Sequence, residues 1–447
     1  MFKPYEQYKP SGIKWLGDVP EHWKVKRLKM AVQLTDRKVA ADEEHPAPYI
    51  GMENIESRTG RLLPINADVI PTGTANAFKA GNTLFGKLRP YLAKVCNPEF
   101  DGLCSTELLV LKSADLDRRL LLYSLLCDGF IKLVDSSTYG SKMPRASWEF
   151  VGDCVVPIAP PNEQLAITSF LNRETAKIDT LVAKKRTLIE RLKEKRTALI
   201  SRTVTRGLPP DAARAAALNP SPKLKPSGID WLGEVQENWD ILRLKNIILG
   251  GVTNGLFKTQ DAFGDGTRLI NVYDAYKSDF IVDEQSLERV ATTTAEVSTY
   301  GVQAGDILFV RSSLKLEGVG RAVYCLNSIE DLVFECHLVR ARPDLRKIDP
   351  RFLIFYLNSQ LVVHLLIAAA NTTTMTTISQ PKILDLPVLV PPCAEQKAIA
   401  DYLEQETAKI NQMTTKVETA IERLQEYRTA VITAAVTGKI DVRGIAA

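Results

Sequence analysis

Residues 163–205 read EQLAITSFLNRETAKIDTLVAKKRTLIERLKEKRTALISRTVT, and residues 395–437 read EQKAIADYLEQETAKINQMTTKVETAIERLQEYRTAVITAAVT. About half of the aligned positions are identical, including ETAKI, IERL and RTA. A double proline precedes each copy, at 160–161 and at 391–392. The chain therefore contains an internal repeat, and two copies are too few for a solenoid.

Each copy is predicted to form one long helix that ends before a glycine, Gly207 or Gly438. Apolar residues recur at alternating spacings of three and four, the heptad pattern of a narrow packing seam. About 43 residues at 1.5 Å per residue give roughly 65 Å of helix. The predicted seam consists of Ile178, Leu181, Leu188, Leu192 and Leu199 in the first copy, and of Ile410, Met413, Val417, Leu424, Tyr427 and Val431 in the second.

A helix with a single apolar seam must bury that seam against a partner, and the obvious partner is the other copy. The connection between the copies has the length of a whole domain. This favours an antiparallel pair with one module at each end and an approximate two-fold axis. Two separate parallel or intermolecular coiled coils remain the alternative.

A second repeat precedes each module. Residues 9–29 read KPSGIKWLGDVPEHWKVKRLK and residues 225–245 read KPSGIDWLGEVQENWDILRLK, with Pro20 and His22 replaced by Gln236 and Asn238. The order motif, module, helix thus occurs twice. The predicted boundaries are 1–160 for the first module with its motif, 161–207 for the first helix, 208–224 for a Pro- and Ala-rich linker, 225–390 for the second module, 391–438 for the second helix and 439–447 for the tail.

The two modules differ strongly in sequence but keep a common outline. AGNTLF at 80–85 is similar to AGDILF at 304–309, and YGSKM at 139–143 falls where NTTTM falls at 371–375. Short β-prone runs (TLFG, DILFV, CVVPIA, VLVPP) lie between turn residues. One apolar helix is expected in each module, around 120–133 and 352–369. The predicted fold class is α+β, with two mixed α/β modules joined by the pair of long helices.

Composition excludes several classes of protein. The net charge of +4 is compatible with nucleic-acid binding but would not suggest it alone. Seven scattered cysteines form no C-x-x-C pair and do not cluster with the four histidines, so neither a metal site nor a disulfide framework is expected. No apolar run is long enough for a membrane span, and the start, MFKPYEQYKP, lacks a signal-peptide apolar region. A cytoplasmic protein without membrane contact is expected.

The layout resembles the DNA specificity subunits of type I restriction-modification systems. The resemblance covers nearly the whole chain and rests on several motifs taken together. They are WLG-x-V-x-E-x-W, PP-x-EQ-x-AI, the repeated ETAKI and RTA, GKLRPYLAK at 86–94 and VTGKIDVR at 436–443.

This resemblance implies two target-recognition domains, each reading one half of a bipartite site in double-stranded DNA. The paired helices would fix the unread gap, and they would dock two methyltransferase subunits. Two translocase-nuclease subunits would join for cleavage. The chain itself would be non-catalytic and bind no cofactor, with S-adenosylmethionine, ATP and Mg²⁺ on the partner subunits.

Two alternatives come from other classes of protein. An enzyme is disfavoured, because no aromatic residue follows either double proline as an amino-methyltransferase would need, and no G-x-x-x-x-G-K-[ST] phosphate loop is present. A non-enzymatic coiled-coil scaffold or another DNA-binding adaptor explains the helices. It does not explain why the modules diverge inside a repeated frame.

Candidate DNA contacts were chosen as basic residues for phosphates and polar side chains for base edges. From Lys184 to Arg206 the first helix carries nine basic residues and two acids, and this face is predicted to lie toward spacer DNA or an acidic partner surface. In the modules, the predicted contacts are Lys87, Arg89, Tyr91, Thr138, Tyr139, Ser141, Lys142, Arg145, Asn254, Lys258, Arg311, Ser312, Lys315, Asn371, Thr372 and Thr373.

Overall fold

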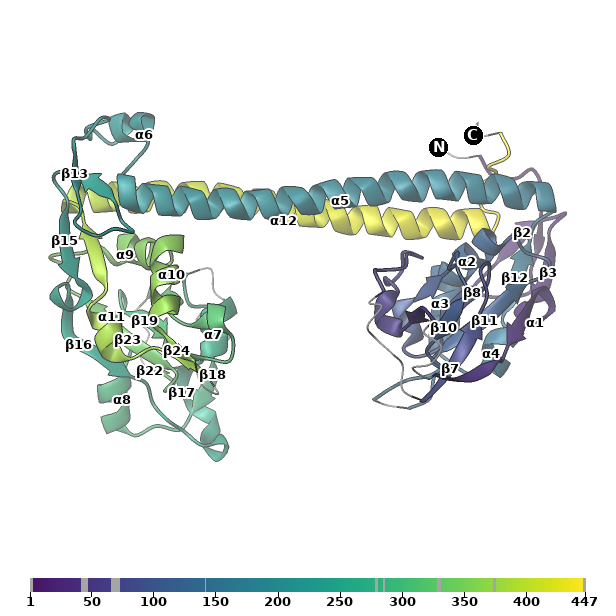
Figure 1. The fold of residues 1–447 in the computed structure, drawn as a ribbon, viewed down its shortest axis with the longest axis horizontal. Helices are drawn as coiled ribbons and strands as arrows, with labels where there is room; N and C mark the ends of the chain where they lie inside the picture. The colour runs from purple at the N-terminus through teal and green to yellow at the C-terminus, as the bar shows by residue number, and fades with distance from the viewer. Residues whose placement is uncertain are drawn as a thin grey trace. The chain divides into compact units, whose positions relative to one another are not determined.

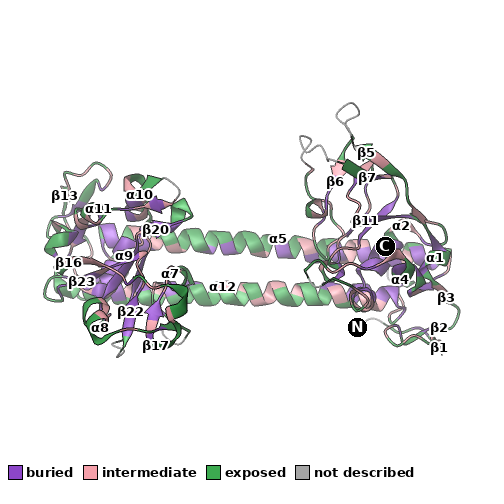
Figure 2. Ribbon diagram, turned by 90° about the horizontal axis from the view of Figure 1, so that it is seen from below, coloured by how far each residue is buried: buried purple, intermediate pink, exposed green. Residues whose placement is uncertain are grey.

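A computed structural model of the chain describes residues 3–41, 47–65, 73–140, 142–277, 280–283, 286–327, 331–372 and 375–444. The chain forms two compact units (Figure 1). Unit 1 consists of Met1–Arg186 and Glu418–Ala447, and unit 2 consists of Thr187–Val417. Figure 2 shows the buried residues gathered among the sheets and helices of each unit, while the central stretches of the two long helices are largely exposed.

The two long helices are α5, Pro161–Arg206, and α12, Cys393–Val436. Each has a glutamate in its first turn, Glu163 or Glu395, where a negative charge suits the amino end of a helix. Each is followed closely by a glycine with positive φ, +84° at Gly207 and +70° at Gly438, which is a common way to end a helix. The helices occupy the ranges that the sequence repeat predicted.

Inside each unit the two helices run antiparallel. In unit 1 the start of α5 shares a hydrophobic core with the end of α12, through Phe170 and Ile432. In unit 2 the end of α5 shares a core with the start of α12, through Val204 and Leu403. The mixed α+β class and the antiparallel pairing agree with the sequence prediction.

The packing seam differs in part from the predicted one. In α5 the buried positions include Val182 and Ile189, each one residue after a predicted seam leucine, Leu181 or Leu188. Two adjacent apolar residues fit a heptad pattern equally well, so spacing alone chose the wrong member of each pair. Of the other predicted positions, Ile178, Leu192, Ile410 and Val431 are buried, and Leu199, Val417 and Leu424 are half-buried. The exposed ones, between 42% and 47%, are Leu181, Leu188, Met413 and Tyr427.

Unit 1 holds two four-stranded sheets, in the orders β4-β11-β8-β9 and β5-β7-β10-β6, beside the helices α2 and α3. The first sheet is antiparallel throughout, and β10 pairs in parallel only with β6. The bounds are β4 Val32–Thr35, β5 Lys38–Ala41, β6 Tyr49–Ile50, β7 Gly73–Phe78, β8 Thr83–Gly86, β9 Val95–Cys96, β10 Gly102–Cys104, β11 Leu108–Ser113, α2 Arg118–Leu126, α3 Asp128–Asp135 and α4 Trp148–Asp153, with the 3₁₀ turns η1 Met52–Asn54 and η2 Pro90–Leu92.

Unit 2 contains the sheet β16-β23-β19-β21, whose strands correspond in the same order to those of the unit 1 sheet β4-β11-β8-β9. A second sheet, β18-β17-β22, again contains a parallel pair, β17 with β22, and a small third sheet has the order β20-β25-β24. The bounds are β16 Ile248–Asn254, β17 Phe263–Ile270, α7 Val272–Lys277, β18 Glu288–Val290, α8 Thr294–Tyr300, β19 Ile307–Val310, β20 Ser312–Ser313, β21 Ala322–Tyr324, β22 Leu332–Phe334, β23 Leu338–Pro343, α9 Pro350–Leu357, α10 Gln360–Ala369, β24 Asn371–Thr372, β25 Thr376–Thr377 and α11 Gln380–Leu384, with the 3₁₀ turns η4 Gln260–Ala262 and η5 Leu316–Gly318.

The repeated motif before each module forms the same frame in both units. A hairpin, β1-β2 or β13-β14, is followed by a strand that pairs with the last strand of its module, β3 with β12 and β15 with β26. The RLK end of the motif is tied to an aspartate, because Lys29 contacts Asp153 and Lys245 contacts Asp385, both at 2.7 Å. The bounds are β1 Tyr8–Pro10, β2 Asp18–Pro20, β3 Lys24–Arg27, α1 Leu28–Ala31, β12 Val155–Ile158, β13 Leu224–Pro226, β14 Glu234–Gln236, β15 Asp240–Arg243, η3 Leu244–Asn246 and β26 Pro387–Val390.

The glutamine of each PP-x-EQ segment forms hydrogen bonds to the residues just before the first helix of its module, α2 or α9. Gln164 accepts a hydrogen bond from the backbone N–H of Asp117, the N-cap of α2, at 2.6 Å. Its Nε2 donates to the carbonyls of Asp115 and Ala159 at 3.0 and 2.9 Å. The same three hydrogen bonds recur in unit 2, where Gln396 contacts Asp349, Lys347 and Pro391.

The apolar helices and the linker differ locally from the prediction. The single apolar helix expected in each module is wrong, since the chain breaks after Leu126 and after Leu357 to give α2 with α3 and α9 with α10. The linker carries a short helix, α6, Pro210–Ala215, in which Ala213 is buried. Among the described residues no single helix is long and apolar enough to cross a membrane, and only the pair α9 and α10, bent by 64°, reaches that length and composition together.

Candidate nucleic-acid interface

Three segments that are distant in the sequence meet at one edge of the unit 1 sheet. They are the exit of β8 at Lys87, the turn before β11 at Glu107 and the loop from Tyr139 to Arg145. Lys87 N donates to the Glu107 carbonyl at 2.9 Å, and Ala146 N donates to the Lys87 carbonyl at 3.0 Å. Antiparallel bridges join Arg145 to Leu88 and to Tyr139. We call this arrangement the platform of unit 1.

An ion pair holds the platform loop of unit 1. Arg145 Nε donates to both carboxylate oxygens of Glu107, at 3.0 and 3.1 Å, and Arg145 Nη2 lies 2.9 Å from Glu107 Oε1. This contact raises the pKa of Arg145 above its ordinary value. The guanidinium is therefore engaged in fixing the loop, while the side chain of Tyr139 is 64% exposed beside it.

Unit 2 builds the same platform with other side chains. Arg311 N donates to the His337 carbonyl at 2.9 Å, and Ile378 N donates to the Arg311 carbonyl at 2.9 Å. Thr377 pairs with Ser312 and with Asn371, as Arg145 pairs with Leu88 and Tyr139. The hydrogen-bond pattern thus equates Lys87 with Arg311, Glu107 with His337, Tyr139 with Asn371 and Arg145 with Thr377.

The equated side chains differ in their hydrogen-bonding groups, although the first pair, lysine and arginine, keeps its positive charge. A lysine, a carboxylate, a phenol and an arginine in unit 1 stand where unit 2 has an arginine, an imidazole, an amide and a hydroxyl. Arginine and asparagine have the planar donor and acceptor geometry that reads guanine and adenine, respectively, in the major groove. The same backbone therefore presents two different sets of hydrogen-bonding groups.

The other predicted residues of unit 1 lie around the platform and differ in their exposure and hydrogen bonds. Arg89 has φ of +50°, and its backbone N–H donates to the Pro144 carbonyl at 2.8 Å. Tyr91 is 43% exposed, and Lys142 is exposed. Thr138 is half-buried, and its hydroxyl donates to the Asp135 carbonyl at 2.8 Å, which stabilises the turn after α3. Ser141 lies outside the described residues.

In unit 2 several predicted residues have partners within the protein. Asn254 accepts a hydrogen bond from Gln380 at 2.9 Å, and Lys258 contacts Glu296 at 2.8 Å. Ser312 is only 6% exposed, which argues against a contact with DNA. The exposed predicted residues are Lys315, Asn371 and Thr372, Arg311 is half-buried, and Thr373 lies outside the described residues.

Sequence reasoning missed the two residues at the centre of the platforms, Glu107 and His337. Each directly precedes the leucine that begins an equivalent strand, Leu108 of β11 or Leu338 of β23. An alignment of the two modules on these strands would have paired them. The turn motifs that the two modules share lie elsewhere in the chain and do not indicate these residues.

Glu335, Cys336 and His337 bring three potential metal ligands within 4.8 Å of one another. The carboxylate of Glu335 already accepts hydrogen bonds from the backbone N–H groups of Val272 at 3.3 Å and His337 at 3.2 Å, and from the Cys336 thiol at 3.7 Å. These bonds explain the position of the carboxylate as the support of a turn beside α7. We therefore assign no metal site to these three residues.

A family model for the type I restriction modification DNA specificity domain matches residues 237–423, which include the whole unit 2 platform. Over the whole chain, the similarity is to specificity subunits of type I restriction enzymes. The chain is 22% identical to the type I restriction enzyme MjaVIII specificity subunit of Methanocaldococcus jannaschii, with 96% of this chain and 95% of the relative covered.

Other relatives match over less of their length. The StySPI specificity subunit of Salmonella potsdam is 24% identical, with 64% of this chain and 57% of the relative covered. The EcoDI specificity subunit of Escherichia coli is 24% identical over 38% of each chain. The chain thus spans less than two thirds of the length of these two relatives. A chain from a solved structure concerned with complex assembly and conformational transition of the type I R-M system matches with a TM-score of 0.65 and 18% identity, over 94% of this chain and 99% of the other, which supports the fold.

Proposed function

We propose that this subunit recognises a bipartite site in double-stranded DNA, with each module reading one half. The observation that carries the proposal is the pair of platforms, in which one hydrogen-bond framework presents Lys87, Glu107 and Tyr139 in unit 1 but Arg311, His337 and Asn371 in unit 2. Two half-sites of different sequence require this combination of a constant frame and different reading groups.

In this proposal the basic platform residues divide into two roles. Exposed lysines such as Lys142 and Lys315 neutralise phosphates, which supplies affinity without sequence preference. Arg311 and Asn371 are the preferred base readers of unit 2, because each side chain can form two hydrogen bonds to one base. Arg145 has the different task of holding the unit 1 loop through Glu107.

The partners are proposed from the family. Two methyltransferase subunits that modify adenine and two translocase-nuclease subunits would assemble on the helices and the frame, in the cytoplasm. The specificity subunit itself would be non-catalytic, with S-adenosylmethionine, ATP and Mg²⁺ bound by the partners. The exposed basic residues of α5, among them Arg191, Lys195 and Arg202, form a surface suited to spacer DNA or to an acidic partner.

The deciding experiment is co-expression with a candidate methyltransferase encoded beside this chain, followed by single-molecule sequencing of methylated adenine. We expect one interrupted motif with a methylated adenine in each half, lost when this chain is omitted. Methylation that persists without this chain would contradict the proposal. A non-enzymatic scaffold would then be the better interpretation of the helices.

A further inference from the structure

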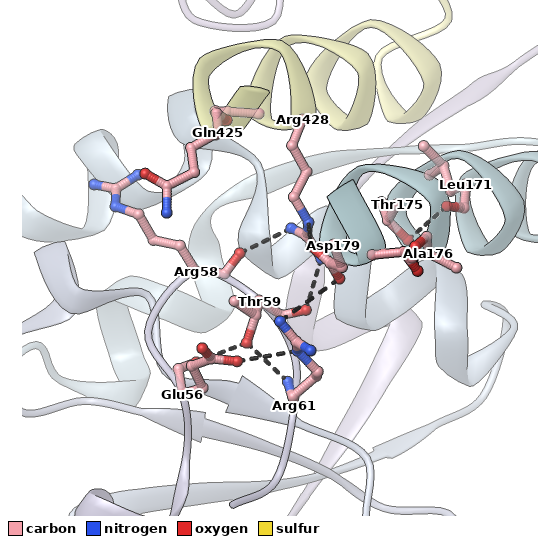
Figure 3. Close-up of polar contacts among 12 residues, drawn as sticks. Glu56, Arg58, Thr59, Arg61, Leu171, Thr175, Ala176, Asp179, Gln425 and Arg428 are labelled. Atoms are coloured by element: carbon pink, nitrogen blue, oxygen red, sulfur yellow. Dashed lines mark hydrogen bonds and ion pairs between the residues drawn. The ribbon is translucent and has the colours of Figure 1, made fainter. Parts of the chain in front are cut away.

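An arginine near the end of α12 ties a loop of the unit 1 module to both long helices. Arg428, the arginine of the second RTA repeat, is only 7% exposed. Its Nε donates to Asp179 Oδ1 of α5 at 3.0 Å, and its Nη1 and Nη2 donate to the carbonyls of Arg58 and Thr59 at 2.9 and 2.8 Å (Figure 3). One buried side chain thus joins three parts of the unit.

The loop that receives Arg428 is shaped for this contact and leads to the platform. Arg58 has φ of +64°, in the left-handed region, and the adjacent carbonyls turn toward Arg428 (Figure 3). The Arg58 side chain in turn donates to the Tyr91 carbonyl at 3.1 Å, next to the platform segment. Arg61 adds a contact to Glu56 at 3.0 Å and lies 4.0 Å from Asp179. A short chain of contacts therefore runs from the helices to the reading surface.

Unit 2 has an arginine at the same place in its own repeat. Arg196 belongs to the RTA of α5, and alignment of the two helix copies equates it with Arg428 and equates Asn411 with Asp179. Its guanidinium lies 4.8 Å from the centre of the Phe280 ring. Phe280 has φ of +70°, so a loop residue in the left-handed region again meets the arginine. The guanidinium thus contacts a carboxylate in unit 1 and an aromatic ring in unit 2.

We propose that the RTA arginine is a positioning residue that sets each recognition module on its own pair of helices. Arg428 acts on the unit 1 module and Arg196 on the unit 2 module. Neither arginine contacts bases. Each fixes where the platform lies along the helices, and therefore how many unread base pairs the complex accepts beside that half-site. This inference rests on the function proposed above.

The test uses the full complex with its methyltransferase and a DNA library in which the spacer between the two half-sites varies by one or two base pairs. Arg428→Gln is expected to slow methylation of the natural site by about tenfold to 10²-fold, because small misplacement of a substrate has effects of this order. It is also expected to raise the relative methylation of sites with altered spacers, while the bases read in each half stay the same.

Matched variants keep the test independent of folding and of charge. Arg423→Gln removes an exposed positive charge from the same helix and should leave the spacer preference unchanged. Asp179→Asn keeps the shape of the contact, and Arg428→Lys keeps the positive charge without the planar guanidinium. The spacer preference of both variants should therefore lie between that of the parent and that of Arg428→Gln. Among these variants, the backbone amides of residues 56–61 should exchange faster the more the variant changes the spacer preference.

Three outcomes separate the two proposals. Altered spacer preference with unchanged half-sites supports positioning by Arg428. A folded Arg428→Gln variant with the parent spacer preference, or one that reads new bases, overturns it. If the parent complex shows no bipartite motif, the proposed function fails. In that case hydrogen exchange alone tests Arg428: faster exchange of residues 56–61 without faster exchange near the platform would overturn its positioning role.

Discussion

In unit 1 the indole N–H of Trp23 donates to Glu163 at 2.9 Å, whereas in unit 2 no described residue accepts a hydrogen bond from the indole of Trp239. Both tryptophans are fully buried, at 1% and 0% exposure. Glu163 also accepts from the Tyr5 hydroxyl at 3.1 Å and contacts His22 at 2.7 Å. Among the described residues, the counterpart Glu395 of unit 2 accepts one long hydrogen bond, from Asn238 at 3.5 Å.

Residues outside the repeated motif add to the polar network around Glu163 in unit 1. Tyr5 comes from the start of the chain, and Arg443, over its ring at 4.9 Å, comes from the end. Glu163 and Asp441 raise the pKa of Tyr5 in addition to the larger effect of burial, so its hydroxyl stays a donor. The apolar packing of the frame is therefore duplicated, while the polar network around it is particular to unit 1.

The largest expected effect tests what the units share. Gln164→Ala and Gln396→Ala each leave one backbone N–H and two carbonyls without their partner, of which the carbonyl of Ala159 or Pro391 is in a buried hydrogen bond and the other two groups are part-buried. At about 1–3 kcal/mol for a buried unsatisfied group and less for a part-buried one, we expect each variant to lose about 3 kcal/mol of unfolding free energy. Denaturant unfolding with hydrogen exchange at the starts of α2 and α9 measures this. A large effect in one unit only would contradict the equivalence of the frames.

A second pair of variants tests what the units do not share. Glu163→Ala removes the acceptor of Trp23, Tyr5 and His22, so a loss of about 2–3 kcal/mol is expected from the buried donors. Glu395→Ala removes one long bond and should cost about 1 kcal/mol or less. Hydrogen exchange of residues 5–23 and 224–239 separates the two units. Equal losses would show that unit 2 has a polar network of the same strength.

The platforms allow a functional version of the same comparison. Arg145→Ala frees the unit 1 loop from Glu107, and we expect DNA affinity to fall about tenfold, or about 1.4 kcal/mol, through the half-site read by unit 1. Thr377→Ala removes no ion pair and should change affinity less. Competition binding with DNA altered in one half-site at a time measures both. If Arg145→Ala weakened both half-sites equally, Arg145 would act on general affinity and not on the unit 1 loop.

The sequence predicted the fold well because the frame and the helices occur twice. Two copies of PP-x-EQ and RTA give the helix bounds, and β-prone runs such as TLFG and DILFV correspond to β8 and β19. The interface was less predictable, because Glu107 and Arg145 are 38 residues apart and meet only through strand pairing. Burial of Ser312 likewise depends on β25, which no local pattern indicates.

The smallest effect concerns the cysteines, which differ between the units without any role in the proposed function. In unit 1 all four are buried, and burial raises the pKa of Cys96 and Cys154 to about 12, so the reactive thiolate is scarce at neutral pH. In unit 2 Cys393 is exposed at the start of α12, and Cys336 is half-buried with its pKa raised by burial and Glu335.

Alkylation of the folded chain at neutral pH should therefore modify Cys393 first and Cys336 more slowly. The four cysteines of unit 1 should remain unmodified until denaturant is added, when all seven react. Peptide mass spectrometry after a time course locates each label, and Cys393→Ser should remove the fast phase alone. Because raised thiol pKa values lower the thiolate fraction, moving from pH 7 to pH 9 should speed the labelling of Cys336 while the unit 1 thiols stay protected by packing. Early labelling in unit 1 would mean that its core opens far more readily than that of unit 2.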